Sequence, residues 1–282
     1  AVNRFGKVDE GTTVTDYDEE AIARKHTLAA ALANCEWNRH KLNLIDTPGM
    51  GNFLADARAA LRVAEAAVVV VDAVGGVQVS TEKVWAEAEA CGLPRLIVVN
   101  RLDRERASLD RALESIKSTL HRSAVPVQLP IGDERDFRGV VDLVGMKAYT
   151  FAGDESGKMT EGPVPDALAG AAQTARDALI EMVAEADDAL MEKFFEAGTL
   201  TRDELVAGLR TAVLGRKVFP LFCTSSILNV GIQTLLDAVI AYVPAPADRP
   251  LKGTKGGQDV SVSATDGGPY AAFVWKTVAD PF

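Results

Sequence analysis

Cysteines and long hydrophobic runs are both scarce in this chain of 282 residues. The three cysteines, Cys35, Cys91 and Cys223, are far apart and lack metal-ligand spacing, so they indicate a reducing compartment rather than disulfides or a zinc site. Apolar runs such as 66–71 and 96–99 fall far short of the roughly 20 residues of a membrane-spanning helix. No charged-then-apolar leader opens the chain. The sequence therefore predicts a cytoplasmic protein with no membrane partner.

An excess of basic residues is also missing. The chain has 30 Lys and Arg against 40 Asp and Glu, which gives a net charge of −10. A chain of this charge has no general basic surface for DNA, and any contact with RNA has to be local. With 48% hydrophobic residues, it is long enough for one large globular domain or two modest ones.

Short apolar runs alternate with helical patterns in the first half of the chain. The runs end on polar residues at 41–46, 67–72 and 95–100, and the helical patterns come after them at 53–63, 81–90 and 106–121. This alternation predicts an α/β fold with a doubly wound, mostly parallel sheet. Such sheets bind ligands at the carboxyl ends of their strands. Asp46, Asp72 and Asn100 lie at those ends, so the loops after them are the candidate site.

The pattern changes in the second half of the chain. A β-rich stretch at 131–151 precedes a turn-rich segment and long alanine- and acid-rich helical segments, and a strand at 217–223 and a helix at 232–242 then restore the first pattern. After Pro244 the composition is that of a linker, and the last residues resemble a strand. We predict a sheet domain at 1–131 and 217–246, an inserted α+β subdomain at 132–216, and a linker with the start of a second, β-barrel domain at 247–282.

The stretch LNLIDTPGMGNF at 42–53 has a carboxylate at the tip of an apolar run and a glycine three residues later. A phosphate site needs a carboxylate for Mg²⁺, usually through water, and a close backbone N–H for the terminal phosphate. Asp46 and Gly49 would supply that pair, because a glycine lets the main chain approach without a Cβ in the way. By itself this short pattern is more often an ordinary turn at the end of a strand.

Two further segments come directly after apolar runs in the same way. In Asn100-Arg101-Leu102-Asp103, the Asp103 carboxylate could accept from the N1 and N2 donors that distinguish guanine from adenine, while Asn100 braces the loop and Arg101 covers one face of the base. The alternative is a solvated loop with a helix cap.

The other segment is Cys223-Thr224-Ser225-Ser226, at the end of the last predicted strand. Hydroxyl and backbone N–H groups of Ser225 and Ser226 could brace the base loop and meet guanine O6. Each segment alone is common in proteins. The three segments together, in this order and at strand ends, indicate a GTPase rather than a chance combination.

With these three segments, the chain resembles the nucleotide-binding region of elongation factor G and its close relatives. The resemblance runs through AVGGVQVSTEKVW at 73–85, PIGDERDFRGVVDLVGMKAYTF at 130–151, LMEKFFE at 190–196 and the closing VADPF. It implies a P-loop GTPase fold, GTP or GDP with Mg²⁺ as ligands, and the ribosome as partner. It also implies that 24–28 is the first switch, with Thr27 the hydroxyl ligand to Mg²⁺; without the family, Thr27 would be a residue on an amphipathic helix.

The chain departs from this family at two residues and at one motif. Met50 stands where the family has the histidine that positions the attacking water, and a thioether neither donates nor takes a proton. Arg101 stands where the family has lysine, a change we expect to be tolerated because Arg can also lie flat on a base. No G-x-x-x-x-G-K-[ST] occurs, and residues 2–7 resemble the segment after the first helix of the family, so we expect the phosphate loop and its strand to lie before residue 1.

Three functional interpretations stay open from the sequence. The favoured one is a GTP-binding translation factor that couples GTP binding and hydrolysis to a step on the ribosome. The second is a guanine-nucleotide or ribosome-binding protein with negligible turnover, for which Met50 is the evidence. The third is a relative of the ribosomal protection factors, which shares fold and partner but differs in task.

Overall fold

A computed structural model of the chain describes residues 6–8 and 10–278. Residues 2–5 of the predicted post-helix segment and 279–282 of the closing motif lie outside this range. The chain divides into two compact units, which we describe separately. The first consists of Ala1–Ala66, Glu87–Leu93 and Pro244–Phe282, and the second of Ala67–Ala86 and Pro94–Val243.

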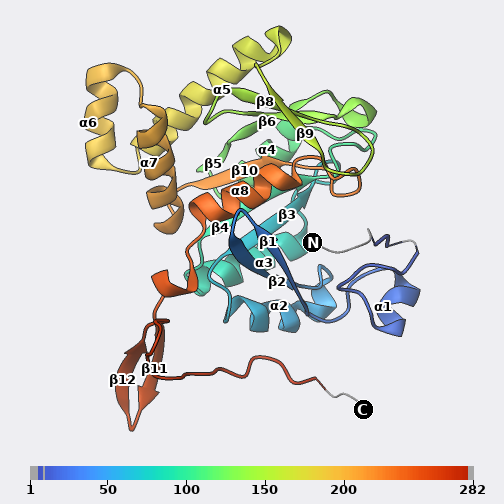
Figure 1. Ribbon diagram of the computed structural model, residues 1–282, viewed down its shortest axis with the longest axis vertical. Coiled ribbons are helices and arrows are strands. Elements are labelled where there is room, and N and C mark those ends of the chain that lie inside the picture. Colours follow the sequence, from blue (N-terminus) through green and yellow to red (C-terminus); the bar gives the residue numbers. More distant parts are fainter. Residues whose placement is uncertain (1–5, 9, 279–282) are drawn as a thin grey trace. The chain divides into compact units, whose positions relative to one another are not determined.

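The first unit is built from short helices and strands that come from the two ends of the chain, as the blue and red colours of Figure 1 show. Its helices are α1 (Glu19–Arg24) and α2 (Leu54–Leu61), with single 3-10 turns η1 (Gly51–Phe53) and η3 (Pro246–Asp248), and its strands are β1 (Ala31–Trp37), β2 (His40–Asp46), β11 (Leu251–Lys255) and β12 (Gln258–Val262).

Strand β2 lies where the sequence predicts it, but its pairing differs from the prediction. Its partner among the described residues is β1, and the pairing is antiparallel, with Ala31 opposite Asp46. Asn38 and Arg39 between the two strands both have positive φ, 44° and 63°. Two such residues make the tight turn that matches the twist of a hairpin. This local turn, which the apolar pattern does not show, pairs β2 with the strand before it.

The C-terminal segment also differs from the prediction. Strands β11 and β12 form an antiparallel hairpin inside the stretch predicted as a linker, and the turn between them is Gly256-Gly257, both with positive φ. Residues 269–278, predicted as a strand, contain none. The exposed Tyr270, Phe273 and Val274 have no strand beside them there, and a strand is stable only when a neighbour satisfies its backbone.

The second unit contains the predicted parallel sheet, with strand order β3-β4-β10-β5. Its strands are β3 (Ala67–Asp72), β4 (Arg95–Asn100), β5 (Ala124–Pro126) and β10 (Phe219–Cys223), and its helices are α4 (Leu109–Thr119) and α8 (Ile232–Tyr242), while α3 (Val79–Ala90) crosses the boundary between the units. The pairings of β4 with β3 and of β10 with β4 and β5 are parallel. The fold class predicted from the sequence is therefore confirmed.

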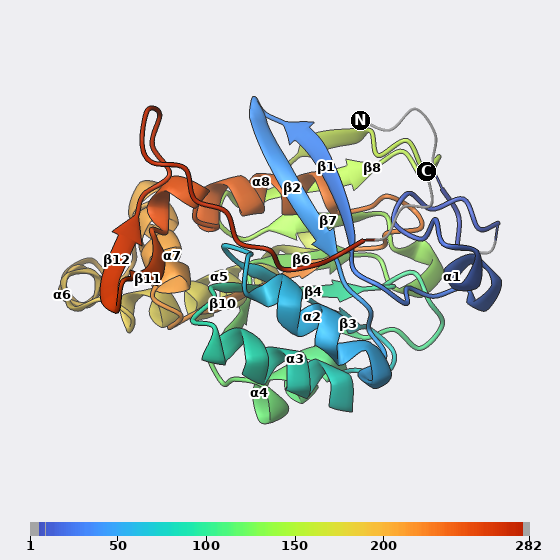
Figure 2. The ribbon, with the colours of Figure 1, turned by 90° about the horizontal axis from the view of Figure 1, so that it is seen from below.

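Strand β4 explains why this sheet is covered on both faces. Leu96 and Val98 belong to a core cluster that includes residues of α8, whereas Ile97 and Val99 belong to a second cluster that includes residues of α4. Successive side chains of a strand point to opposite faces, so a run that is apolar at every position needs a layer on each side. Figure 2 shows α4 and α8 on opposite sides of the strands.

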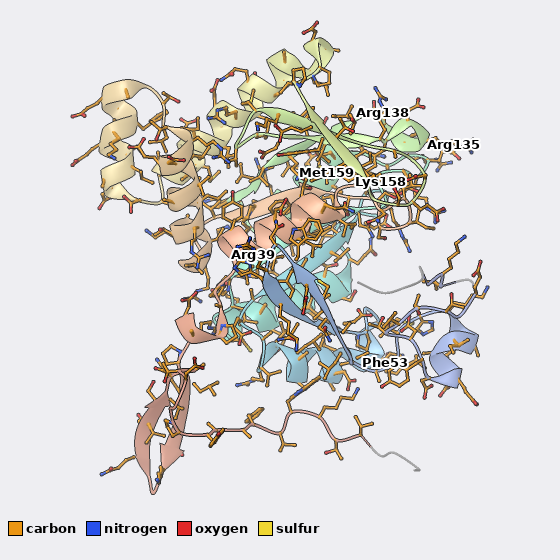
Figure 3. The ribbon with its side chains drawn as sticks, viewed as in Figure 1. Arg39, Phe53, Arg135, Arg138, Lys158 and Met159 are labelled. Carbon is orange, nitrogen blue, oxygen red and sulfur yellow. The ribbon has the colours of Figure 1, made fainter. Side chains whose placement is uncertain are left out.

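The β-rich and helical segments between β5 and β10 form the inserted part. A second sheet, antiparallel and ordered β6-β7-β8-β9, precedes three helices. The elements are β6 (Gln128–Ile131), η2 (Glu134–Asp136), β7 (Gly139–Asp142), β8 (Lys147–Phe151), β9 (Met159–Gly162), α5 (Asp166–Ala184), α6 (Asp188–Ala197) and α7 (Arg202–Leu214). The buried Phe137 anchors the turn between β6 and β7, while Arg135 and Arg138 beside it are exposed (Figure 3).

The second sheet begins a few residues before the predicted insertion boundary at 132, and one core cluster joins Leu96 of β4 to Val141 of β7 and Leu209 of α7. The insertion therefore shares apolar contacts with the parallel sheet. The three-part domain division stays a prediction.

We expect the glycine that directly precedes α8 to be important for stability. Gly231 has φ +80°, and a Cβ there would lie 2.2 Å from the Cys223 carbonyl oxygen. Gly198 after α6 has a similar φ of +70° but open space around its Cβ position. Gly198→Ala should cost about 1 kcal/mol for left-handed backbone strain, and Gly231→Ala about 1 to 3 kcal/mol more from the steric clash. Urea unfolding of the two variants measures both; equal losses would contradict this account.

Candidate functional site

Three loops of the second unit meet at the carboxyl edge of the parallel sheet, after β3, β4 and β10. Asp72 and Asn100, the last residues of β3 and β4, are direct partners across the two strands. The Ala73 N–H donates to the Asn100 carbonyl at 2.9 Å, and the Leu102 N–H donates to the Thr224 carbonyl at 3.3 Å. Backbone hydrogen bonds therefore join all three loops.

The Asn100 side chain connects the loop after β4 to the loop after β10. Its Oδ1 accepts from the Ser226 N–H at 3.0 Å and from the Thr224 hydroxyl at 3.2 Å, and its Nδ2 donates to Ser226 Oγ at 3.1 Å. One amide thus holds a segment 126 residues further along the chain. This contact matches the bracing role that the sequence suggests for Asn100.

The two serines of the site differ in their surroundings. Ser225 is fully buried, and its hydroxyl accepts from the Leu228 N–H at 3.3 Å while its N–H donates to the Val230 carbonyl. Ser225 therefore shapes its own loop. Ser226 is exposed, and its N–H and hydroxyl are already engaged with Asn100.

Asp103 is the least satisfied polar group of the site. Its side chain is only 13% exposed, and its Oδ1 is buried with no hydrogen-bond partner among the residues that the structure describes. Its Oδ2 is 3.9 Å from Arg104 Nε. A buried acceptor without a donor costs about 1 to 3 kcal/mol, and native structures rarely keep one without a reason. A ligand with N–H donors would satisfy this oxygen.

Arg101 lies beside Asp103 in the same loop but turns toward the loop after β3. Its φ is +67°, and its Nη1 is 2.9 Å from Asp72 Oδ2. Burial raises the pKa of the Asp72 carboxyl, but the N–H groups of Gly75 and Val74 and the Arg101 guanidinium outweigh burial, so the pKa lies below its ordinary value. Asp72 is therefore a carboxylate at neutral pH and pairs with Arg101.

The other predicted site residues belong to the first unit. Thr27 lies three residues beyond the end of α1, so it is not on the helix. Asp46 ends β2, and Met50, 49% exposed, directly precedes η1 without capping it through its side chain. That these residues share one nucleotide with the loops of the second unit stays a prediction.

The phosphate contact that the sequence suggests for Gly49 stays a prediction. A Cβ at this position would meet no atom within 4 Å, and the backbone φ is not positive. Nothing in the unit itself requires glycine there. A ligand that approaches the exposed main chain is a reason for it.

The donor chemistry at Thr27 and Asp46 fits Mg²⁺. Neither side chain makes a hydrogen bond or ion pair with another residue in the described ranges, so a hydroxyl and a carboxylate oxygen are available. Mg²⁺ prefers oxygen ligands and keeps several waters, so it needs few protein groups. Among the described residues there is no group of three or more His, Cys, Asp or Glu that could hold a metal ion.

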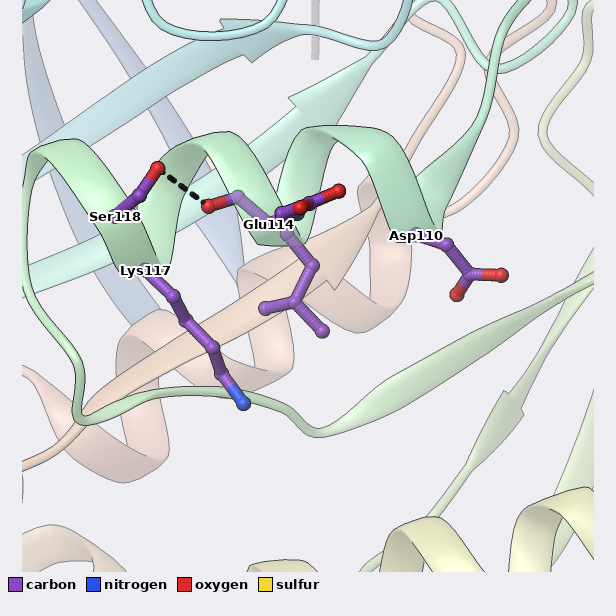
Figure 4. A pocket seen from close by; sticks show the side chains of 5 residues that line it. Asp110, Glu114, Lys117 and Ser118 are labelled. Carbon is purple, nitrogen blue, oxygen red and sulfur yellow. Dashed lines mark hydrogen bonds between the residues drawn. The ribbon is translucent and has the colours of Figure 1, made fainter.

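One surface depression lies on a single face of α4 (Figure 4). Asp110, Glu114, Lys117 and Ser118 line it at helical spacing, together with Leu113. The Ser118 hydroxyl donates to the Glu114 carbonyl within the helix. None of the predicted site residues lines this depression, and its residues converge on no common point.

Two residues of the site are not among the predicted ligands. Thr224 is within the predicted segment, but its bond to Asn100 depends on strands that meet only in the fold. Asp72 is predicted at a strand end, but without a role. The signal for its loop is present in the sequence, because an Asp three residues before a Gly-Gly pair is typical of a turn.

An α/β sheet whose loops meet at its carboxyl edge is the arrangement in which doubly wound domains hold nucleotides. A family model described as the elongation factor Tu GTP binding domain matches residues 1–245. The chain therefore belongs to this family of GTP-binding domains, whose members are GTPases.

A solved structure supports the same relation. The chain is similar to a protein from Thermus thermophilus known from its crystal structure, with a TM-score of 0.81 and 34% sequence identity. The match covers 88% of this chain and 38% of the other chain. The present chain thus corresponds to less than half of that protein. Among the residues described here, no helix is long and apolar enough to cross a membrane.

We expect Asn100→Ala to loosen the loop after β10. The variant leaves the Ser226 N–H without its acceptor, and one hydrogen bond contributes about 1 kcal/mol, or roughly fivefold in local opening. Amide hydrogen exchange at Ser226 should accelerate by that factor. Asn34→Ala, on the exposed β1, is the control and should leave exchange at Ser226 unchanged. Unaltered exchange in Asn100→Ala would show that the backbone alone holds the loop.

Proposed function

We propose that the loops after β4 and β10 bind the guanine base of GTP or GDP. The observation that supports this most directly is the buried, unpartnered Oδ1 of Asp103. Guanine N1–H and N2–H would donate to the two oxygens of this carboxylate. Adenine lacks that donor pair, so it would leave the carboxylate unpaired at the same cost as in the free protein.

The loop geometry supports this assignment in a second way. Asn100 holds the Thr224 and Ser226 segment against the loop that carries Asp103, through contacts that the protein makes by itself. A recognition site that is already ordered loses less entropy on binding. We assign the face of the base to Arg101 and the region of guanine O6 to the Ser226 hydroxyl, which accepts from Asn100 and can still donate its own proton. The fully buried Ser225 shapes the loop that carries Ser226.

The phosphate side of the nucleotide is assigned to the first unit. Thr27 and Asp46 would hold Mg²⁺, the latter usually through water, and the Gly49 N–H would meet the terminal phosphate. The ion, when bound, neutralises charge that develops on the phosphate oxygens. These assignments rest on the oxygen donors and on the open surroundings of Gly49.

We further propose that the protein is a cytoplasmic translation factor of the elongation factor G type that acts on the ribosome. Support comes from the family to which the chain belongs and from the four elongation factor G-like segments of its sequence. The three-part division, with the GTP-binding domain at 1–131 and 217–246 and the insertion at 132–216, belongs to the same proposal.

A second candidate function differs from the first only in whether the bound GTP is hydrolysed. In it the protein binds guanine nucleotide but hydrolyses it negligibly, and the exposed Met50 is the observation that favours it. A thioether cannot orient or deprotonate water as an imidazole can. A ribosomal protection factor would share the nucleotide site and differ in its task on the ribosome.

Replacing Asp103 with Asn tests the base assignment. The amide Nδ2 donates where the carboxylate accepted, so the full-length variant should prefer xanthine nucleotides, which present a carbonyl where guanine has its amino group. We expect the parent to prefer guanine over adenine nucleotides by on the order of a thousandfold, or about 4 kcal/mol, and the variant to lose this preference. Competition binding with GDP, ADP and XDP measures both effects.

Asp110→Asn, on the exposed first turn of α4, is the matched control and should bind like the parent. Selectivity that stays unchanged in Asp103→Asn would refute the role of Asp103.

Replacing Met50 with His tests whether hydrolysis is impaired. If a positioned side chain must orient the water, Met50→His should raise ribosome-dependent GTP hydrolysis by about a hundredfold. Met159→His, at a similarly exposed methionine on β9 (Figure 3), is the control and should change nothing. A parent that already turns over as fast as the Met50→His variant would mean that another residue orients the water.

A further inference from the structure

We propose that Asp72 is a positioning residue for nucleotide binding, which acts by holding the Arg101 side chain in place before the base arrives. This inference rests on the proposed guanine site. It adds a third loop, the one after β3, to the two loops that carry the base-binding residues. Asp72 itself is not assigned a contact with the nucleotide.

The Asp72 carboxylate is fixed by its own loop. Its Oδ1 accepts from the N–H groups of Val74 and Gly75, both at 2.8 Å. Gln78 Nε2 donates to the Gly75 carbonyl at 2.8 Å, and the Gly76 N–H donates to the Asp72 carbonyl at 2.9 Å. One carboxylate oxygen is therefore used to build the turn, and the other, Oδ2, faces Arg101.

Arg101 needs such a partner because only its backbone is otherwise held. The residues on either side are fixed: Asn100 by its side-chain bonds to the loop after β10, and the buried Leu102 by its N–H bond to the Thr224 carbonyl. The Arg101 side chain is 61% exposed, and among the described residues Asp72 is its single hydrogen-bond partner. Its left-handed backbone, φ +67°, is the conformation in which the side chain reaches that partner.

An arginine that must cover a base loses much side-chain freedom when it binds. The pair with Asp72 removes part of that freedom in the free protein, so binding costs less entropy. Because Arg101 would meet the face of the base rather than its edge, this gain does not depend on which purine is bound. Asp72 should therefore change affinity, whereas Asp103 sets selectivity.

Asp72→Asn separates the two uses of the carboxylate. Asparagine keeps an oxygen acceptor for the N–H groups of Val74 and Gly75, so the turn is retained, but it removes the charge that holds Arg101. In the full-length protein we expect the variant to bind GDP and IDP about three- to tenfold more weakly, with the GDP-to-IDP ratio unchanged. The loss should shrink at high salt, because exposed ion pairs are screened.

A double-mutant cycle tests whether Asp72 acts through Arg101. In an Arg101→Met background, which keeps an unbranched stem without the charge, Asp72→Asn should cause no further loss. Glu161→Gln is the matched control, because it removes an exposed pair with Lys147 of similar length on the inserted sheet. It should leave nucleotide affinity unchanged.

The outcomes are distinct. Parent-like affinity in Asp72→Asn, or an equal loss in the Arg101→Met background, would overturn the positioning role while the guanine site stands. A changed GDP-to-IDP ratio would also overturn it, because it would place Asp72 at the edge of the base. A full-length parent that binds no guanine nucleotide would overturn the proposed function, and this inference with it.

Discussion

The side chain of Asn100 is the interaction on which the candidate site depends. It joins the ends of two neighbouring parallel strands, β4 and β10, through three hydrogen bonds to Thr224 and Ser226. Backbone pairing fixes the strands themselves but not the loops beyond them. Because Asn100 lies at the last paired position of β4, its side-chain bonds hold the loops in a fixed position relative to the sheet. These loops are the ones that we assign to the base of the nucleotide.

The sheet can supply that rigidity because both of its faces are buried. Alternating residues of β4 pack into two separate cores, one with α8 and one with α4. The core on the α8 side continues into the inserted sheet and helices, so the insertion stabilises the face of the sheet that it covers. A shift of β4 along its neighbours would disturb both cores at once, which fixes where Asn100 and Asp72 stand.

Three charged side chains of the site have different tasks because their surroundings differ. Asp103 is largely buried, and its Oδ1 has no hydrogen-bond partner among the described residues, so a donor on a ligand would satisfy it. One oxygen of the Asp72 carboxylate accepts hydrogen bonds from backbone N–H groups, and the other pairs with Arg101. Arg101 is exposed, and among the described residues that pair is its one side-chain hydrogen bond. We thus assign selectivity to Asp103, positioning to Asp72 and coverage of the base to Arg101. The three side chains differ in how far they are buried, and their tasks differ accordingly.

The sequence by itself determined the α/β fold class, the bounds of β3, β4 and α8, and the loops that carry the candidate site, because continuous apolar runs and their polar ends are local patterns. It did not determine that β2 pairs with β1, since the turn at Asn38 and Arg39 depends on backbone conformation rather than on hydrophobic pattern. Only the tertiary structure decided that Asn100 meets Ser226 and that Arg101 meets Asp72. These contacts join residues far apart in the chain, and the register between parallel strands, which no single stretch of sequence records, brings them together.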